Sequence, residues 1–132
     1  GNTMNSKILF VSGNLLLTPE FLSDIDYSKS SIVVQDKNPT MNFEISGISE
    51  KQRLTSLCLG EKNNFWTESV FLRGRETIER FYDIVSNPDF KNKFLFEAIN
   101  ELSKTKDISV MKNHGTPILK INNLKSLKEI EK

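Results

Sequence analysis

The sequence predicts an α+β fold, in which an antiparallel or mixed sheet packs against an αα-hairpin and short helices. Runs of β-branched and aromatic residues, typical of strands, lie near both ends of the chain. The middle carries two segments with the apolar spacing of amphipathic helices. The composition, 37% hydrophobic and 27% charged among 132 residues, fits one folded domain. We assign residues 4–132 to this domain and interpret residues 1–3, which precede Met4, as a cloning remnant.

The first third of the chain is predicted to hold strands and one short helix. Residues 8–11 form an apolar run that ends at a Ser-Gly-Asn turn, which indicates a buried strand. Thr18 followed by Pro19 begins a helix that should end near Ile25. Residues 31–46 contain a β-branched run and then alternate apolar and polar residues, so they are predicted to form a hairpin or meander.

A further helix is predicted from Ser49 to Leu59. Its first residue and Gln52 have the spacing of a capping box. Leu54 and Leu57 would share one face, and Gly60 follows where a helix commonly stops.

The αα-hairpin is predicted in the middle of the chain, after a strand at residues 65–72. Residues 77–85 carry apolar side chains at helical spacing. Asn87 would cap a second helix that begins at Pro88 and runs to about Ser103. The short connection between the two helices predicts a tight antiparallel pair.

The C-terminal part is predicted to form a β-hairpin and a last helix. Residues 107–111 and 117–121 are apolar-rich and flank a connection that contains Asn and Gly. The last helix would begin at Asn122 or Asn123 and present lysines on one side.

Charge, cysteine content and apolar runs indicate the compartment and the kinds of partner that the protein can have. The net charge is +1, but residues 104–132 carry seven basic and three acidic residues, a local net charge of +4. Cys58 is the only cysteine, so no internal disulfide can form, which predicts a reducing compartment, most simply the cytoplasm. No apolar run approaches the roughly 20 residues of a membrane-spanning helix. We therefore expect no membrane partner.

Patterns that carry catalysis are sparse. The Gly-rich patterns that hold nucleotide phosphates are absent from the sequence, since Gly13 stands alone after the first predicted strand. His114 is the only histidine and therefore the candidate acid or base, with Asp107 or Lys112 near it; the alternative is a solvated turn residue. One thiol and one histidine cannot build a thiolate zinc site, so we expect neither metal nor cofactor.

Five residues are candidates for binding. Arg73 and Arg75 precede a predicted helix start, where two guanidinium groups could hold a phosphate or the carboxylates of a partner. Trp66 is a residue type that dominates binding interfaces, although a core position is the alternative. Lys112 and His114 lie in the predicted hairpin connection.

The sequence therefore favours a small non-catalytic protein-binding module, such as a bacterial immunity, antitoxin or toxin-inhibitor protein whose partner is a toxin or effector. One alternative is an enzyme that uses His114. The other is a nucleic-acid-associated protein that uses the basic C-terminal third, whose lysines are Lys104, Lys106, Lys112, Lys120, Lys125, Lys128 and Lys132. The sequence does not indicate the oligomeric state.

Overall fold

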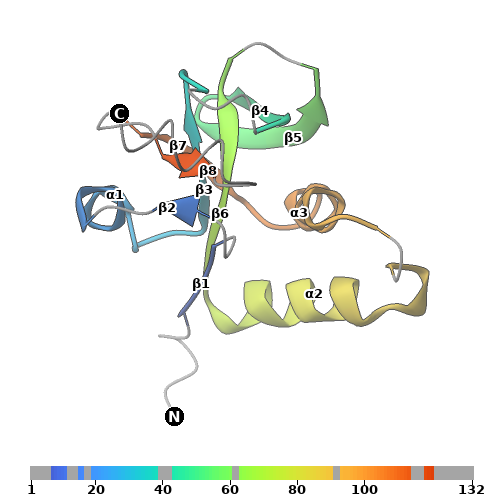
Figure 1. Ribbon diagram of the computed structural model, residues 1–132. Helices are drawn as coiled ribbons and strands as arrows, with labels where there is room; N and C mark the ends of the chain where they lie inside the picture. The colour runs from blue at the N-terminus through green and yellow to red at the C-terminus, as the bar shows by residue number, and fades with distance from the viewer. Residues whose placement is uncertain are drawn as a thin grey trace.

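The computed structural model describes residues 7–11, 15–16, 19–38, 43–60, 63–90, 93–113 and 118–120. The elements within these residues are, in chain order, β1 (Lys7–Phe10), β2 (Leu15–Leu16), α1 (Pro19–Asp24), β3 (Ser31–Gln35), β4 (Ile45–Glu50), β5 (Arg53–Leu59), β6 (Phe65–Arg73), α2 (Arg75–Ser86), the 3-10 turn η2 (Pro88–Phe90), α3 (Leu95–Ser103), β7 (Ser109–Lys112) and β8 (Leu119–Lys120) (Figure 1). The predicted last helix, from residue 122 onward, lies outside the described residues.

The main sheet is a barrel-like circuit of five strands with a sixth strand attached. β6 pairs with β3, β3 with β7, β7 with β5, β5 with β4, and β4 returns to β6. β1 pairs with the other end of β6, where Lys7 to Phe10 lie opposite Arg73 to Val70. β3 and β7 run parallel and the other ladders are antiparallel, which confirms the predicted α+β class with a mixed sheet.

Helices and a small second sheet cover the two faces of the main sheet. In Figure 1, α2 and α3 lie on one side of β6, and α1 and the β2–β8 pair lie on the other. Two apolar cores result. The core beneath α2 and α3 includes Ile32, Leu54, Leu72, Ile99 and Leu102. The second core includes Ile25, Val33, Phe43, Phe71 and Ile118.

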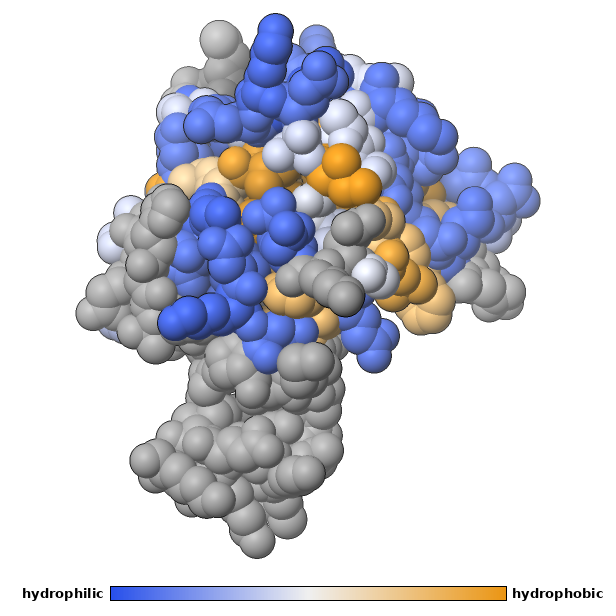
Figure 2. All heavy atoms as spheres, turned by 90° about the horizontal axis from the view of Figure 1, so that it is seen from above, coloured by the Kyte–Doolittle hydropathy of each residue, from blue (hydrophilic) through white to orange (hydrophobic). Residues whose placement is uncertain are grey.

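The surface that carries the β4–β5 hairpin is mainly hydrophilic, with hydrophobic side chains in a band between charged ones (Figure 2). The most exposed large apolar side chains in the described part of the chain are Phe94, at 71%, and Leu59, at 62%. None of the helices in the described ranges has both the length and the hydrophobicity needed to cross a bilayer.

The predicted helix from Ser49 to Leu59 is wrong, because these residues form the end of β4, a turn and β5. The turn is made by Lys51 and Gln52, which both have positive φ, at 53° and 68°. A β-bulge explains the misleading pattern. Leu54 pairs opposite Ser49 and Ser56 opposite Ile48, so Thr55 is an extra residue in β5. The bulge turns Leu54 and Leu57 toward the same face although they are three residues apart, which imitates the spacing of a helix.

Both predicted β-hairpins are also wrong, although most of their strands exist. β3 forms as expected, but it pairs with β6 and β7 rather than with the segment that follows it. β7 and β8 do not pair with each other, because β7 pairs with β3 and β5 while β8 pairs with β2. In both cases the two segments predicted to pair have other partners, most of them from distant parts of the chain.

The predicted αα-hairpin is not formed as a tight pair. α2 confirms the first helix, but α3 begins only at Leu95. At Pro88 the chain makes the 3-10 turn instead, since the amide of Phe90 bonds to the carbonyl of Asn87. Helix α3 then starts where the Glu97 carboxylate accepts the Phe94 amide at 2.7 Å. The two helices still contact each other, but across a longer connection than predicted.

Candidate functional site

Three strands of the main sheet run in the same direction. β1 and β3 both run antiparallel to β6, and β7 runs parallel to β3, so β1, β3 and β7 share one direction. Ligands of sheets with parallel strands commonly bind just beyond the carboxyl ends of those strands. We call the ends of β3 and β7 at this edge the carboxyl edge, and define it by Gln35, Asp36, Asn38, Lys112 and Asn113.

The side chain of Gln35 holds a distant part of the chain at this edge, because it bonds the backbone of Ile118 as a neighbouring strand would. Its side chain is buried, and its Nε2 donates to the carbonyl of Ile118 at 2.9 Å while its Oε1 accepts the Ile118 amide at 2.8 Å. Asn113 Nδ2 donates to the same Oε1 at 3.4 Å, and the Asn113 amide donates to the carbonyl of Val34 at 2.8 Å. The residues on either side of positions 114–117 are therefore both anchored to the end of β3.

Asn38 does the same for the neighbouring connection. Its Nδ2 donates to the carbonyl of Phe43 at 2.7 Å, and its Oδ1 accepts the Phe43 amide at 3.4 Å. The residues that flank positions 39–42 are thus held together by one amide side chain. The described residues on both sides of positions 39–42 and 114–117 are therefore fixed at the carboxyl edge.

Lys112 supplies a positive charge at the carboxyl edge. Its Nζ lies 3.0 Å from Asp36 Oδ1, and the side chains are 40% and 60% exposed. An exposed pair of this kind contributes at most about 1 kcal/mol to stability. The Lys112 ammonium can therefore exchange Asp36 for an anionic ligand at little cost.

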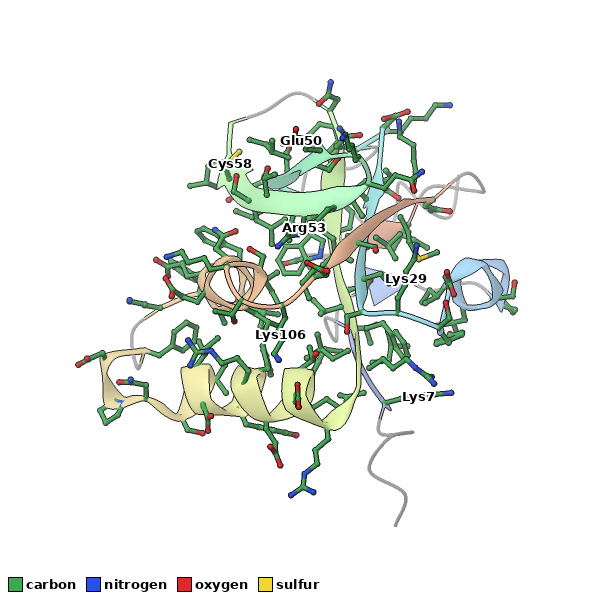
Figure 3. All side chains as sticks on the ribbon, turned by 180° about the vertical axis from the view of Figure 1, so that it is seen from behind. Lys7, Lys29, Glu50, Arg53, Cys58 and Lys106 are labelled. Carbon is green, nitrogen blue, oxygen red and sulfur yellow. The ribbon has the colours of Figure 1, made fainter. Side chains whose placement is uncertain are left out.

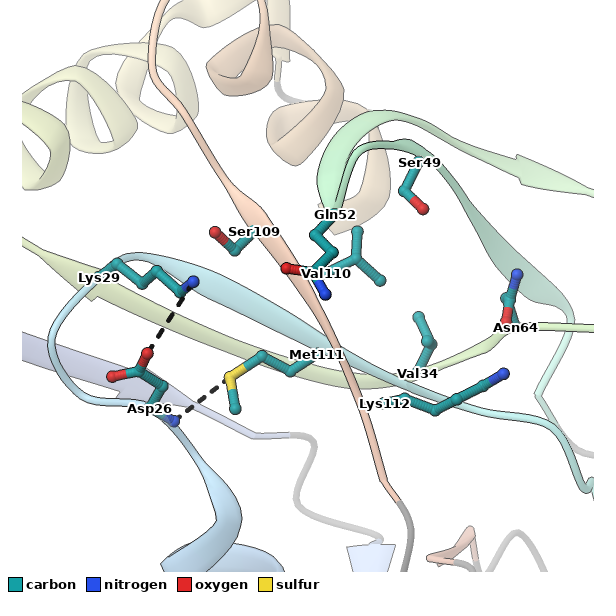
Figure 4. Close-up of a pocket in the computed structure, with 10 residues that line it drawn as sticks. All are labelled: Asp26, Lys29, Val34, Ser49, Gln52, Asn64, Ser109, Val110, Met111 and Lys112. Atoms are coloured by element: carbon teal, nitrogen blue, oxygen red, sulfur yellow. Dashed lines mark hydrogen bonds and ion pairs between the residues drawn. The ribbon is translucent and has the colours of Figure 1, made fainter.

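A groove of about 730 Å³ runs along β7 from the carboxyl edge (Figure 4). It exists because β5 pairs with β7 only at Arg53 and Ser109, after which the β4–β5 hairpin diverges. Polar side chains and the apolar side chains of β7 share its lining. The lining residues are Asp26, Lys29, Val34, Ser49, Gln52, Asn64, Ser109, Val110, Met111 and Lys112. A ligand here would meet hydroxyl, amide, ammonium and carboxylate groups over an apolar floor.

Asp26 lies at the end of the groove away from Lys112, and its side chain is held as a carboxylate. The hydroxyl and the amide of Ser28 both donate to Asp26 Oδ1, and Lys29 Nζ lies 3.9 Å from Asp26 Oδ2. The hydrogen bonds from Ser28, with a smaller contribution from Lys29, hold the pKa of Asp26 below its usual range.

This lowered pKa predicts an acid-dependent contribution to stability. A carboxyl whose pKa is lower in the folded than in the unfolded protein stabilises the fold above its unfolded pKa, and this contribution is lost as the pH falls through the folded pKa. We expect Asp26→Asn to be less stable than the wild type near neutral pH and the difference to shrink toward pH 2. Urea unfolding at several pH values measures it. Ser28→Ala should reproduce part of the loss, and a difference that grows with acidification contradicts the assignment.

The residues predicted for binding are spread over the structure. Trp66 is 3% exposed and its indole N–H donates to the carbonyl of Ser69 at 3.1 Å, so it lies in the core. Arg73 Nη1 donates to the carbonyl of Tyr27 at 3.1 Å. Arg75 Nε lies 2.7 Å from Glu79 Oε1 on α2, and this carboxylate raises the pKa of Arg75.

The two guanidinium groups thus have different partners and do not form a common cradle. Of the predicted residues, Lys112 belongs to the candidate site, and His114 lies outside the described residues. The sequence analysis missed Gln35 and Asn38. The available signal was a polar residue at the end of a continuous β-branched run.

The lysines of the predicted basic surface are ion-paired wherever the structure describes their side chains. Lys104 Nζ lies 2.8 Å from Glu101 Oε1, and this contact lowers the pKa of Glu101. Lys106 Nζ lies 3.3 Å from Glu76 Oε2, and Figure 3 shows it directed toward α2. Together with the Lys112–Asp36 pair, these contacts leave no unpaired lysine stripe among the described side chains of residues 104–113. Nor do the described ranges contain a group of three or more His, Cys, Asp or Glu residues that could hold a metal ion.

Comparison with known proteins identifies the fold. No family model and no curated protein sequence matches the chain. The structure resembles the CTP:phosphocholine cytidylyltransferase from Streptococcus pneumoniae, with a TM-score of 0.74 at 13% identity, over 93% of this chain and 55% of that one. The inositol-1-phosphate CTP transferase from T. maritima gives 0.65 at 14% identity, over 95% and 54%. The UTP-bound UGPase from Acinetobacter baumannii gives 0.61 at 11% identity, over 96% and 50%.

These comparisons correct the functional prediction. Six of the similar structures are nucleotidyltransferases or sugar-nucleotide pyrophosphorylases, and none of these six is an immunity, antitoxin or inhibitor protein. The interpretation as a non-catalytic module of that kind is therefore wrong. It relied on the lack of short catalytic motifs, whereas the resemblance lies in pairings between distant strands. This chain spans about half the length of each similar structure. Its fold is nucleotidyltransferase-like.

Proposed function

We propose that the protein acts in nucleotidyl transfer and binds the phosphorylated small molecule that receives the nucleotidyl group. The observation that carries the proposal is the resemblance to the cytidylyltransferase over 93% of the chain at a TM-score of 0.74. Three of the similar proteins are named for the same type of reaction, in which a nucleotide is joined to phosphocholine, inositol 1-phosphate or glucose 1-phosphate. We also propose that the protein acts in a reducing compartment, as its single cysteine, Cys58, predicts.

The carboxyl edge and the groove suit such an acceptor. A phosphate monoester needs a cation and hydrogen-bond donors, and Lys112 offers the cation where the parallel strands end. The amide side chains of Gln52 and Asn64 lie in the same groove and can contact the uncharged part of the acceptor. In the reaction, an oxygen of the acceptor phosphate attacks the α-phosphorus of a nucleoside triphosphate, a phosphoanhydride bond forms, and pyrophosphate leaves. Lys112 would lower the repulsion between the two anionic reactants.

Acceptor binding tests the proposal directly. We expect phosphocholine, inositol 1-phosphate or glucose 1-phosphate to shift amide resonances at the carboxyl edge, and the unphosphorylated alcohols to shift them much less. Lys112→Met should weaken this binding by roughly tenfold or more, as expected for the loss of a charge-assisted hydrogen bond. The matched control is Lys104→Met, which removes another ion-paired lysine charge, a more exposed one, from the end of α3.

Two results would contradict this assignment. One is that none of the phosphorylated compounds binds, and the other is that both lysine variants weaken binding equally. Transfer itself is measured by incubating the protein with each acceptor and α-labelled CTP or UTP, then following the labelled product and the released pyrophosphate.

A further inference from the structure

A second hollow, of about 610 Å³, is lined by the β4–β5 hairpin and the end of α3, and we call it the hairpin hollow. Among the described residues it shares no lining residue with the groove along β7. Arg53, which lines it, pairs with Ser109, and Ser109 also pairs with Ser31. These serines are the first residues of β7 and β3, so the hollow lies near the amino ends of these strands, away from the carboxyl edge. Its polar lining residues are Glu50, Lys51, Arg53, Thr55, Ser103 and Lys104.

Positive charge dominates the hairpin hollow. Among the described lining residues, Lys51, Arg53 and Lys104 are cations and Glu50 is the one anion, so the lining has a net charge of +2. Figure 3 labels Glu50 and Arg53 on the hairpin, above α3 in that view. The fold thus brings two cations of the hairpin together with a third from a helix about 50 residues later in the chain.

The three cations can turn to a ligand at little cost. Arg53 uses its Nε for Asp107 Oδ1, at 3.0 Å, which leaves its two Nη groups as donors. Lys104 is paired with Glu101, but both side chains are exposed, and such a pair stabilises the fold little. Lys51 has no ion-pair partner in the described part of the chain. An anion in the hollow would therefore displace no strong interaction.

The turn holds Lys51 in a backbone conformation that strains a lysine. Lys51 and Gln52 have φ values of 53° and 68°, where hairpin turns favour Asn and Gly. Gln52 lines the groove along β7 and Lys51 lines the hairpin hollow, so the two strained residues belong to different hollows. Backbone strain of this kind is often found at ligand-binding positions. The strain at Lys51 therefore agrees with a binding role for its side chain.

The other polar groups of the hollow do not attract an anion. The hydroxyls of Thr55 and Ser103 both donate to backbone carbonyls, so neither is a donor for a ligand. The C-terminal end of α3 carries the partial negative charge of a helix terminus. The attraction has to come from three cations on two elements, which favours an anion with more than one charged group.

We propose that the hairpin hollow is a second anion-binding site, which takes a small anion with two linked phosphate groups. A guanidinium group can bind two oxygens of one phosphate, and a lysine ammonium acts as a point charge for another. Two linked phosphates let Arg53 and the two lysines bind without competing for the same oxygens. The inference rests on the hollow alone and is independent of the acceptor chemistry proposed above.

A titration with inorganic pyrophosphate, followed by NMR of the backbone amides, tests the proposal. Pyrophosphate should shift the amides of residues 51–55 and of Lys104. Inorganic phosphate, which has one phosphate group, should bind at least fivefold more weakly. Octathymidylate, a nucleic-acid strand with the same backbone chemistry, should bind these residues no more tightly than pyrophosphate does.

Variants of the lining make the assignment specific. Lys51→Met and Arg53→Met should each weaken pyrophosphate binding about fivefold, as expected for the loss of one partly exposed charge-assisted contact. Glu50→Gln should strengthen it about twofold, because it removes the carboxylate from the lining. The matched control is Lys7→Met, which removes an exposed lysine at the start of β1, away from the hollow (Figure 3).

A further variant separates binding from folding. Lys51→Gly removes the side chain and adopts a positive φ without strain. It should raise the urea midpoint of unfolding and weaken pyrophosphate binding as much as Lys51→Met does. A lowered midpoint would show that Lys51 supports the turn itself, which overturns the binding role inferred from its strain.

Three binding results overturn the proposal. They are pyrophosphate that shifts no hairpin amide, equal weakening by Lys51→Met and Lys7→Met, and octathymidylate that binds more tightly than pyrophosphate. The last result would assign these cations to a nucleic-acid backbone. Lys104→Met should weaken pyrophosphate binding here and leave the carboxyl edge unaffected, whereas Lys112→Met should do the reverse. The two sites are followed by different amide resonances, so the failure of one proposal is distinguishable from the failure of the other.

Discussion

Replacing Gln35 with Met is expected to lower the free energy of unfolding by about 3 kcal/mol, because each buried backbone group left without a partner costs about 1–3 kcal/mol. The side chain of Met fills a similar volume but cannot hydrogen-bond. The amide and the carbonyl of Ile118 would both lose their partner, at a position where Ile118 is buried. Urea unfolding followed by fluorescence measures the change.

Two further variants make this result specific. Lys37→Met changes an exposed residue just beyond β3 and should alter stability by less than about 0.5 kcal/mol. Gln35→Glu keeps an acceptor for the Ile118 amide but cannot donate to the Ile118 carbonyl while ionised. We expect this variant to recover stability relative to the wild type as the pH falls, since only the protonated carboxyl is a donor. A Gln35→Met protein as stable as Lys37→Met would show that the bonds to Ile118 contribute nothing.

Replacing Asn100 with Leu is expected to cost about 2–3 kcal/mol and to expose the edge of β5. Asn100 Oδ1 accepts the Leu57 amide at 2.6 Å, and its Nδ2 donates to the Leu57 carbonyl at 3.0 Å. These two bonds attach α3 to the sheet. Leu cannot make them, so the variant should unfold at lower urea concentration and show faster exchange of the Leu57 amide.

The matched control on the same helix is Glu101→Gln. It removes only an exposed ion pair with Lys104, which contributes at most about 1 kcal/mol. Asn100→Asp should lose stability as well, because its carboxylate would face the Leu57 carbonyl. If Asn100→Leu left both the urea midpoint and the Leu57 exchange rate at wild-type values, the attachment of α3 would have to rest on apolar packing alone.

Elements whose pattern is local were predictable from the sequence. The strand at the start of the chain, helix α1, strand β6 and helix α2 all follow from apolar runs, capping residues or helical spacing. The β4–β5 hairpin was not predictable in this way. Its turn uses Lys51 and Gln52 at positive φ where Gly or Asn is the usual signal, and the bulge at Thr55 gives Leu54 and Leu57 a helical spacing.

The candidate site was predictable only in part, for a related reason. Lys112 could be singled out because a lysine two residues before the only histidine, in a predicted connection, is visible in the sequence. The role of Gln35 depends on Ile118, which lies 83 residues later, and nothing in the residues around Gln35 specifies that partner. The same holds for the sheet, because most of its ladders join strands that are not neighbours along the chain.

The order in which the strands emerge during synthesis follows from the place of β6 in the sheet. β6 is the partner of β1, β3 and β4, yet it comes after all three in the chain. At the usual translation rate of about 5–20 residues per second, β1 leaves the ribosome roughly 3–12 s before β6. During those seconds the apolar side chains of β1 and β3 have no sheet to join. The nascent chain therefore passes through a stage in which these apolar strands lack their main pairing partner.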